Sequence, residues 1–324
     1  MIDRRQLMGL GLAATVASTG ARAQSSTAKV TPWPGSESFP LWPGPPPNSP
    51  PTPPRQRGEM SGNPANPELW MRGVAVPTVS VFRPERPDGR AVLSIPGGGY
   101  SFVSVENEGI NVAKALNPKG ITVFVLTYRL PIDGWKNPAD VPQQDAIRAM
   151  RLIRSRAGEF RIDPDKLGIV GFSAGGHLGA TLATGYDDVV YAPVDAADRL
   201  SARPAFAGLV YAVTTIAVAG PKSQSRKNLL GENPSPALVA RYAAESRIDH
   251  ETPPIFLVHA IDDDLVPVEM SLSTLATARA AGVPVEAHLY EKGGHGFGVG
   301  NGPDHPAAGW TDIFDRWITR QLAE

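Results

Sequence analysis

The chain has 324 residues, 42% of them hydrophobic, which is enough for a large domain with a substantial core. Its 31 basic and 32 acidic residues give a formal net charge of -1 without a long run of either sign, which argues against nucleic-acid binding. The absence of cysteine excludes disulfides, thiolate metal sites and thiol nucleophiles.

The first residues have the pattern of an export signal. Arg4 and Arg5 precede an apolar stretch from Leu7 to Val16, and Ala21-Arg22-Ala23 has the small-x-small form of a signal-peptidase site. The paired arginines resemble a twin-arginine signal, although the phenylalanine common at the position of Leu7 is missing. Because a bilayer span needs roughly 20 apolar residues, we expect residues 1–23 to be a cleaved signal. The mature chain should then be periplasmic or secreted and make no membrane contact.

Prolines dominate the next segment, where regular apolar spacing is almost absent. Proline fixes φ and removes a backbone donor, so this stretch cannot form a helix or a central strand. It also carries large apolar groups, which an extended arm usually lays on a protein surface: Trp33, Phe39, Leu41 and Trp42. We therefore expect a proline-rich arm over residues 24–70, packed against a catalytic domain over residues 71–324.

Short β-rich runs alternate with helix-like segments through that domain, which predicts a mostly parallel sheet with helices on both faces. The expected strands are Thr78–Val81, Ala91–Ile95, Ile121–Thr127, Leu167–Gly171, Gly208–Val213, Ile255–Val258 and Val285–Tyr290. The expected helices are Gln144–Arg156, Gly176–Thr184, Pro267–Ala281 and Trp310–Leu322. Ligands bind such sheets at the carboxyl ends of the strands.

The pentapeptide Gly171-Phe172-Ser173-Ala174-Gly175 lies between an expected strand and an expected helix. Small residues on both sides of Ser173 allow a tight turn that lifts the hydroxyl above the sheet, which is the context of a nucleophile elbow. A G-x-S-x-G pentapeptide alone is frequent by chance in a glycine-rich chain. Its position between strand and helix makes Ser173 the candidate nucleophile.

A serine hydroxyl needs a base to take its proton, and histidine suits this role because its ordinary pKa is about 6.5. His295 lies in the glycine-rich loop Glu291–Gly298 after the last expected strand, from where an imidazole can reach the serine. For the other histidines we expect structural or surface roles: His177, His250, His259, His288 and His305.

A second glycine-rich loop, Ile95–Tyr100, follows an expected strand. Glycines allow the backbone to approach a substrate closely, and an oxyanion needs preorganised backbone N–H donors. Gly98 and Gly99, together with Ala174 after the serine, are the candidate donors. Alone the loop is a glycine-rich turn; its occurrence with the elbow and the histidine loop favours a catalytic role.

Several segments together resemble the bacterial acetyl xylan esterase-like branch of the α/β-hydrolases, from about Pro40 to the C-terminus. They are Pro96–Tyr100, Tyr128–Pro131, Gly171–Leu178, Asn228–Gly231, Thr252–Pro254 and Glu291–Gly298. The resemblance implies an α/β-hydrolase fold and the removal of acetyl groups from plant polysaccharides. Lipase-type relatives have histidine at the position of Pro96, a departure that leaves the backbone donors intact.

In α/β-hydrolases the triad acid lies between the serine and the histidine in the chain. Asp262, Asp263 and Asp264 follow the expected strand Ile255–Val258, and we choose Asp263 because this fold commonly has the acid three residues before a Val-Pro pair. Asp262 is the reserve candidate, and Asp264 is expected to be a solvated neighbour or a helix cap. A metal site at these aspartates has little support, so we expect neither a metal nor another cofactor.

The expected reaction is two-step acyl transfer, with Ser173 as nucleophile, His295 as base and Asp263 as acid. The expected substrate is a small-molecule or oligosaccharide ester, under a cap formed by residues 214–250. A general short-chain carboxylesterase with the same triad is the main alternative. A glycosidase needs two carboxylates flanking the sugar, and a non-catalytic binding protein would leave Ser173 unreactive toward a fluorophosphonate. The sequence does not predict the oligomeric state.

Overall fold

A computed structural model describes residues 32–216, 223–300 and 302–323. The export signal expected over residues 1–23, the start of the arm and residues 217–222 of the expected cap lie outside the described residues. Within the described ranges, none of the helices combines the length and the apolar character required to cross a bilayer.

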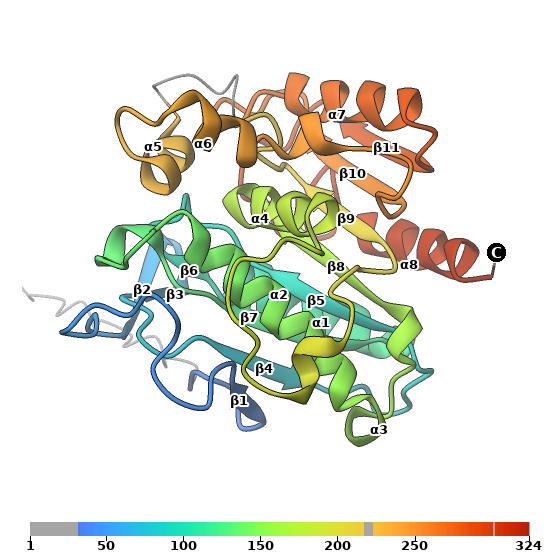
Figure 1. The fold of residues 1–324 in the computed structure, drawn as a ribbon. Helices are drawn as coiled ribbons and strands as arrows, with labels where there is room; N and C mark the ends of the chain where they lie inside the picture. The colour runs from blue at the N-terminus through green and yellow to red at the C-terminus, as the bar shows by residue number, and fades with distance from the viewer. Residues whose placement is uncertain (1–31, 217–222, 301, 324) are drawn as a thin grey trace, which may run out of the picture.

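An eight-stranded sheet in the order β1-β4-β7-β5-β8-β9-β10-β11 forms the centre of the molecule (Figure 1). Neighbouring strands from β7 to β11 in this order are parallel, while β4 and β1 run antiparallel at one edge. The strands are β1 (Ser38–Pro40), β4 (Thr78–Phe82), β5 (Ala91–Ile95), β7 (Thr122–Thr127), β8 (Leu167–Phe172), β9 (Ala207–Val210), β10 (Ile255–Ala260) and β11 (Val285–Tyr290). The seven expected strands all lie in this sheet, and the predicted fold class is confirmed.

Helices cover both faces of the sheet (Figure 1). One face carries α2 (Asp140–Ser155), α4 (Ser173–Thr184) and α7 (Glu269–Ala280), and the other carries α1 (Asn111–Leu116) and α8 (Trp310–Gln321). Shorter helices are α3 (Ala157–Phe160), α5 (Gln224–Leu230) and α6 (Pro236–Arg241). Glu106–Ile110 forms a π-helical turn, and 3₁₀ turns cover Asn117–Lys119, Pro131–Asp133, Pro164–Lys166, Ala196–Arg199 and Ala244–Arg247.

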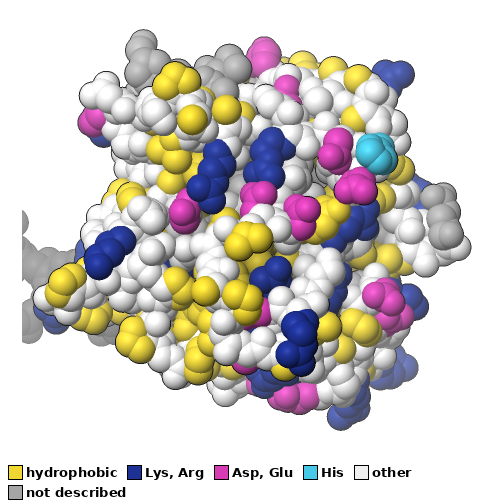
Figure 2. Space-filling model, in the orientation of Figure 1, with side chains coloured by type: hydrophobic (Ala, Val, Ile, Leu, Met, Phe, Trp, Pro, Cys, Tyr) yellow, Lys and Arg dark blue, Asp and Glu magenta, His cyan; other side chains and the backbone are white. Residues whose placement is uncertain are grey.

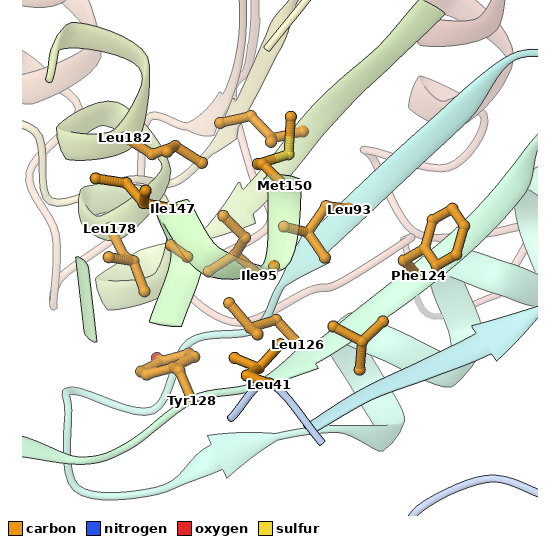
Figure 3. Packing of buried hydrophobic residues seen from close by; sticks show 14 of the residues in the cluster. Leu41, Leu93, Ile95, Phe124, Leu126, Tyr128, Ile147, Met150, Leu178 and Leu182 are labelled. Carbon is orange, nitrogen blue, oxygen red and sulfur yellow. The ribbon is translucent and has the colours of Figure 1, made fainter. Parts of the chain in front are cut away.

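The strands supply apolar side chains to both faces, as expected for parallel strands buried on two sides. In β5, Leu93 and Ile95 pack with α2 and α4, whereas the preceding residue, Val92, packs with α1 and α8. Figure 3 shows Leu93 and Ile95 among Ile147 and Met150 of α2 and other members of the same cluster. The carboxyl ends of the central strands are thereby held between two packed layers, which fixes the loops that follow them.

The described part of the arm packs along the β4 edge of the sheet. Phe39 lies in β1, an edge strand that pairs with β4, and Leu41 and Trp42 are buried. The Trp42 Nε1–H donates to Asp145 Oδ1 at 2.8 Å. An edge strand tolerates the flanking prolines because one of its sides needs no ladder hydrogen bonds.

A second sheet, which the sequence did not predict, consists of β2 (Arg57–Asn63), β3 (Asn66–Arg72) and β6 (Val103–Ser104). The expected division between residues 70 and 71 falls inside β3, so the hairpin β2–β3 joins the arm to the body. The sequence did not predict this hairpin, because its strands contain few apolar residues and lie among several glycines and prolines. Strand β3 of the hairpin is stabilised by pairing with β6, beside the first glycine loop.

One further expectation, the end of a strand, differs from the structure. The ninth strand ends at Val210 instead of Val213, because Tyr211 takes a φ of 38° and the chain leaves the sheet. In the segment expected to form a cap, α5 and α6 lie together at one end of the molecule, near the carboxyl ends of the strands (Figure 1). On the side of the molecule shown in Figure 2, Lys and Arg are interspersed with Asp and Glu, in keeping with the nearly balanced charge.

Candidate active site

Ser173 lies at a sharp turn between β8 and α4. Its φ of 51° is in the left-handed region, which is uncommon for a residue with a Cβ and is typical of a strained functional turn. A Cβ on Gly175 would lie 2.2 Å from the Ile95 carbonyl oxygen, and one on Gly171 would lie 2.5 Å from the Gly175 carbonyl oxygen. The glycines on both sides are therefore required for the turn that the sequence predicted.

Ser173, His295 and Asp263 form one hydrogen-bonded chain. His295 Nε2 lies 2.9 Å from Ser173 Oγ, and His295 Nδ1 lies 2.7 Å from Asp263 Oδ2. Ser173 follows β8, His295 follows β11 and Asp263 follows β10, so all three side chains lie at the carboxyl edge of the sheet. This arrangement gives the imidazole one nitrogen for the serine proton and the other for the carboxylate.

The environment of Asp263 favours a charged carboxylate. Burial alone would raise its pKa, but hydrogen bonds involving His259, His295 and the Val266 N–H hold the pKa well below the usual range. The Val266 N–H donates to Asp263 Oδ1 at 2.8 Å, and His259 Nε2 lies 3.3 Å from Oδ2. The side chain therefore presents a fixed negative charge to the His295 ring.

The neighbouring aspartates have other partners. Asp262 is exposed and its Oδ1 accepts a hydrogen bond from the Gly294 N–H at 2.8 Å, while Asp264 is exposed at the rim of the cleft. In the parts of the chain that the structure describes, no group of three or more His, Asp or Glu side chains is arranged to hold a metal ion.

The first glycine loop lies beside Ser173. Gly98 and Gly99 have φ values of 127° and 58°, and both line the same cleft as the serine. Among the described residues, no acceptor is found for the N–H groups of these two glycines. The Ala174 N–H lies in the first turn of α4, where backbone donors have no intrahelical acceptor. All three expected oxyanion donors therefore lie close to the serine, and their N–H groups are not used in helical or sheet hydrogen bonds.

Glu108, in the π-helical turn, is a buried residue of the site that the sequence analysis missed. Its Oε2 accepts a hydrogen bond from the Gly97 N–H at 2.6 Å, and its Oε1 accepts one from the Tyr211 hydroxyl at 2.7 Å. The Gly298 N–H donates to the same hydroxyl at 3.0 Å. Burial raises the pKa of Glu108 to about 7, although the Tyr211 and Gly97 donors oppose the shift.

These bonds connect the glycine loop to the histidine loop through one carboxylate and one phenol. The Tyr211 ring also meets the His295 ring edge-on, with centroids 4.9 Å apart. Asn107 adds a further link, because its Nδ2 donates to the Gly296 carbonyl at 2.9 Å. The signal in the sequence was weak, because Glu108 is a single glutamate before Gly109-Ile110, in a segment for which the sequence predicted no helix or strand.

Two of the other histidines have buried hydrogen-bond partners away from the serine. His177 is buried between the Tyr100 hydroxyl and the Tyr242 carbonyl, and burial lowers its pKa to about 4. His259 is held by the Ser271 hydroxyl and the Val266 carbonyl and supports the acid.

The triad and the glycine loop open into a cleft of about 1090 Å³. Strand β3 and the loop before β6 form one wall, and α7 with Ser223 and the first residues of α5 forms another. Residues on these walls include Glu68, Trp70, Phe102, Ser223, Gln224, Ser225, Glu269 and Met270. Asn228 of α5 donates to the Gly99 carbonyl at 2.7 Å, which joins the expected cap to the glycine loop.

A family profile described as BD-FAE matches residues 81–277, well over half of the chain. The chain belongs to the BD-FAE family. The matched region of this BD-FAE member includes the first glycine loop, Ser173 and Asp263, and ends before His295.

Two curated proteins are similar to this chain over part of their length. The BD-FAE chain is 35% identical over 223 residues to an acetylxylan esterase of Xylanibacter ruminicola and 34% identical over 220 residues to an endo-1,4-beta-xylanase B of Butyrivibrio fibrisolvens. Each alignment covers 68% of this chain but only 43% and 34% of the respective relative. The chain therefore matches less than half of the length of either protein.

A solved structure matches the BD-FAE chain over more of its length. The acetyl ester-xyloside bifunctional hydrolase of Caldicellulosiruptor lactoaceticus superposes with a TM-score of 0.71 at 34% identity, covering 88% of this chain and 96% of that one. The expected resemblance to acetyl xylan esterase-like α/β-hydrolases is confirmed.

Proposed function

We propose that this chain is a serine carboxylic-ester hydrolase that uses Ser173, His295 and Asp263. The observation that carries the proposal is the continuous hydrogen-bonded chain between these three side chains, at a cleft beside unpaired backbone donors. A nucleophile, a base within hydrogen-bond reach and a group that orients the base are the elements of this chemistry.

In the first step, His295 Nε2 takes the Ser173 hydroxyl proton while Oγ attacks the ester carbonyl carbon. The tetrahedral oxyanion accepts hydrogen bonds from the N–H groups of Gly98, Gly99 and Ala174. When it collapses, the carbon–oxygen bond to the alcohol breaks, and the imidazolium gives its proton to the departing alcohol. An acyl-enzyme on Ser173 remains.

In the second step, His295 takes a proton from water, whose oxygen attacks the acyl carbon. Collapse of the second tetrahedral intermediate breaks the bond to Oγ and returns the proton to the serine, releasing the acid. Throughout the cycle the Asp263 carboxylate holds the tautomer with hydrogen on Nδ1 and stabilises the imidazolium. The low pKa of Asp263 supports this role.

We further propose that the acyl group removed is acetyl, carried by xylan or another acetylated saccharide. The names of an esterase relative and of a solved structure support this substrate class, and the cleft has polar and aromatic walls. We do not propose glycoside cleavage, although one relative is named a xylanase, because the hydrogen-bonded chain of Ser173, His295 and Asp263 is suited to acyl transfer.

The test compares acetate release from acetylated xylo-oligosaccharides with hydrolysis of p-nitrophenyl acetate and octanoate. Ser173→Ala is the control. Acetate release that disappears in the variant is the expected result, together with fluorophosphonate labelling that also requires Ser173. Cleavage of the synthetic esters alone would assign a general short-chain esterase. Equal activity in the variant would overturn the triad, and xylan cleavage by the variant would reveal a glycosidase.

We also propose that residues 1–23 direct export by the twin-arginine route, on the pattern of Arg4, Arg5 and the apolar stretch after them. Cell fractionation tests the proposal. Replacement of both arginines by lysine should retain the chain in the cytoplasm, and unchanged export of the variant would refute this route.

A further inference from the structure

Two aromatic rings lie against each other on the wall of the cleft. Trp70 of β3 and Phe102, in the loop between the first glycines and β6, stack with centroids 3.6 Å apart and planes inclined by 13°. Both side chains are half-buried and both line the cleft that contains Ser173. The mechanism described above uses neither ring.

The pair is held rigidly next to the glycine loop. The N–H groups of Ser101 and Phe102 donate to the Gly98 carbonyl at 2.9 and 3.2 Å, and Trp70 faces Ser104 in the β3–β6 ladder. Arg72 donates to the Ser101 carbonyl at 2.9 Å, and its guanidinium lies 5.0 Å from the centre of the Phe102 ring. The position of the rings is therefore fixed relative to the oxyanion donors.

A carboxylate borders the two rings. Glu68 Oε1 accepts hydrogen bonds from Trp70 Nε1 and from the Ser104 hydroxyl, whereas Oε2 has no hydrogen-bond partner among the described residues. Glu68 lines the cleft, and burial raises its pKa. An aromatic surface is thus combined with a free acceptor at its rim.

We propose that Trp70, Phe102 and Glu68 form a saccharide subsite, which binds a pyranose ring on the alcohol side of the ester. The inference rests on the proposed function, since it assigns a place to the sugar whose acetyl group Ser173 would remove. A pyranose presents C–H groups on its faces and hydroxyls around its edge, and this combination matches an aromatic pair with an acceptor beside it.

The same wall is poorly suited to an acyl chain. An apolar chain over the rings would remove Glu68 and Ser104 from water without giving the free carboxylate oxygen a donor, and an unpaired buried polar group is costly. A sugar hydroxyl supplies that donor. The polar rim therefore favours the saccharide as the occupant.

Binding is tested with unacetylated xylotetraose and the full chain carrying Ser173→Ala, by titration calorimetry. Adding Trp70→Ala should weaken binding on the order of 10-fold, because the ring supplies most of the stacking surface. Trp70→Phe should bind within about 3-fold of the parent, because a ring is kept. The matched control is Trp33→Ala, a half-buried tryptophan that does not line the cleft and should leave binding unchanged.

Kinetics with Ser173 intact distinguish a sugar subsite from a structural or acyl-binding role. In Trp70→Ala, the ratio of kcat/KM for an acetylated xylo-oligosaccharide to kcat/KM for p-nitrophenyl acetate should fall on the order of 10-fold. Equal losses on both substrates would make Trp70 structural and overturn the inference. A loss confined to p-nitrophenyl octanoate would assign the rings to the acyl chain and also overturn it.

The two proposals fail in different ways. If the wild-type chain releases no acetate from saccharides while xylotetraose binding still depends on Trp70, the substrate proposal fails and the subsite remains. If acetate is released but the Trp70→Ala ratio and xylotetraose binding are unchanged, the subsite fails and the proposed function remains.

Discussion

Three consecutive aspartates occupy three different environments, and only the middle one faces the His295 ring. Asp262 holds the backbone of the histidine loop at Gly294, and Asp264 is exposed at the rim of the cleft. The sequence could place all three after a strand, but their spacing alone could not select one. The choice of Asp263 needed the register of the Val-Pro pair, a feature of the fold that the chain resembles.

Replacing the central aspartate tests its role. Asp263→Asn should lower kcat on p-nitrophenyl acetate by about 10⁴-fold, because the amide stabilises the wrong histidine tautomer and no longer balances the imidazolium. Asp262→Asn is the matched control, since its amide oxygen can still accept from the Gly294 N–H; its kcat should stay within about 5-fold. Steady-state kinetics decide, and the reverse order would assign the acid to Asp262.

Glu108 shows what a sequence pattern cannot reveal. Its partners, the Gly97 N–H and the Tyr211 hydroxyl, come from segments 11 and 103 residues away along the chain. No local spacing links these positions, and the hydroxyl of Tyr211 contacts the carboxylate from the point where the chain leaves the sheet after β9. The predicted triad depends on local motifs, whereas this support depends on tertiary packing.

The buried carboxylate predicts a pH-dependent stability. Because its pKa of about 7 lies above the ordinary value of 4.5, the folded chain binds this proton more tightly than the unfolded chain. The contribution is present below pH 4.5 and is lost as the pH rises to about 7, a total of about 3 kcal/mol. Urea unfolding at pH 5 and pH 8 should therefore show a smaller difference in Glu108→Gln than in the wild type.

The comparison uses the change between the two pH values, so a constant cost of the Glu108→Gln substitution cancels. Other shifted groups, such as Asp133 and His177, contribute equally to both proteins and also cancel. An unchanged pH dependence in the variant would show that Glu108 does not titrate in this range.

At the scale of elements, prediction succeeded where a segment carried its own pattern. The helix Gln144–Arg156 was predicted from its apolar face, and the observed α2 begins earlier, at Asp140, where burial extends the helix. The hairpin β2–β3 was missed because β2 has no buried residue, β3 has only Leu69 and Met71 buried, and β3 pairs with the distant strand β6. When a strand is stabilised mainly by a partner that is distant in the chain, its own sequence has little power to predict it.

The elbow gives a prediction at the same scale, using two glycines of one helix. Gly175→Ala should lower the free energy of unfolding by about 3 kcal/mol, because its Cβ would lie 2.2 Å from the Ile95 carbonyl oxygen. Gly179→Ala should change stability by between about 0 and +1 kcal/mol, because its Cβ would meet Ile169 at 3.4 Å and alanine favours helix. Chemical denaturation measures both, and equal effects would contradict the steric argument.

For the whole molecule, the sheet and its two helical layers could be predicted because central parallel strands are continuously apolar and alternate with amphipathic helices. The attachment of the arm could be predicted only in outline. The arm is anchored at a buried ion pair between Arg129 and Asp145. Trp42 of the arm donates a hydrogen bond to Asp145, and the Pro47 carbonyl accepts one from Arg129. The sequence around these two charged residues does not indicate that they are buried.

Loss of this buried ion pair should lower the stability of the fold and weaken the attachment of the arm. Asp145→Asn leaves the Arg129 guanidinium buried without its anion, and removal of one partner of such a pair costs about 3–5 kcal/mol. The weaker acceptor also loosens Trp42, so limited proteolysis should cut the proline-rich arm faster. The control is Glu232→Gln in the exposed pair with Lys227, which should change stability by less than about 0.5 kcal/mol. Equal stability of the two variants would mean that the buried pair does not anchor the arm.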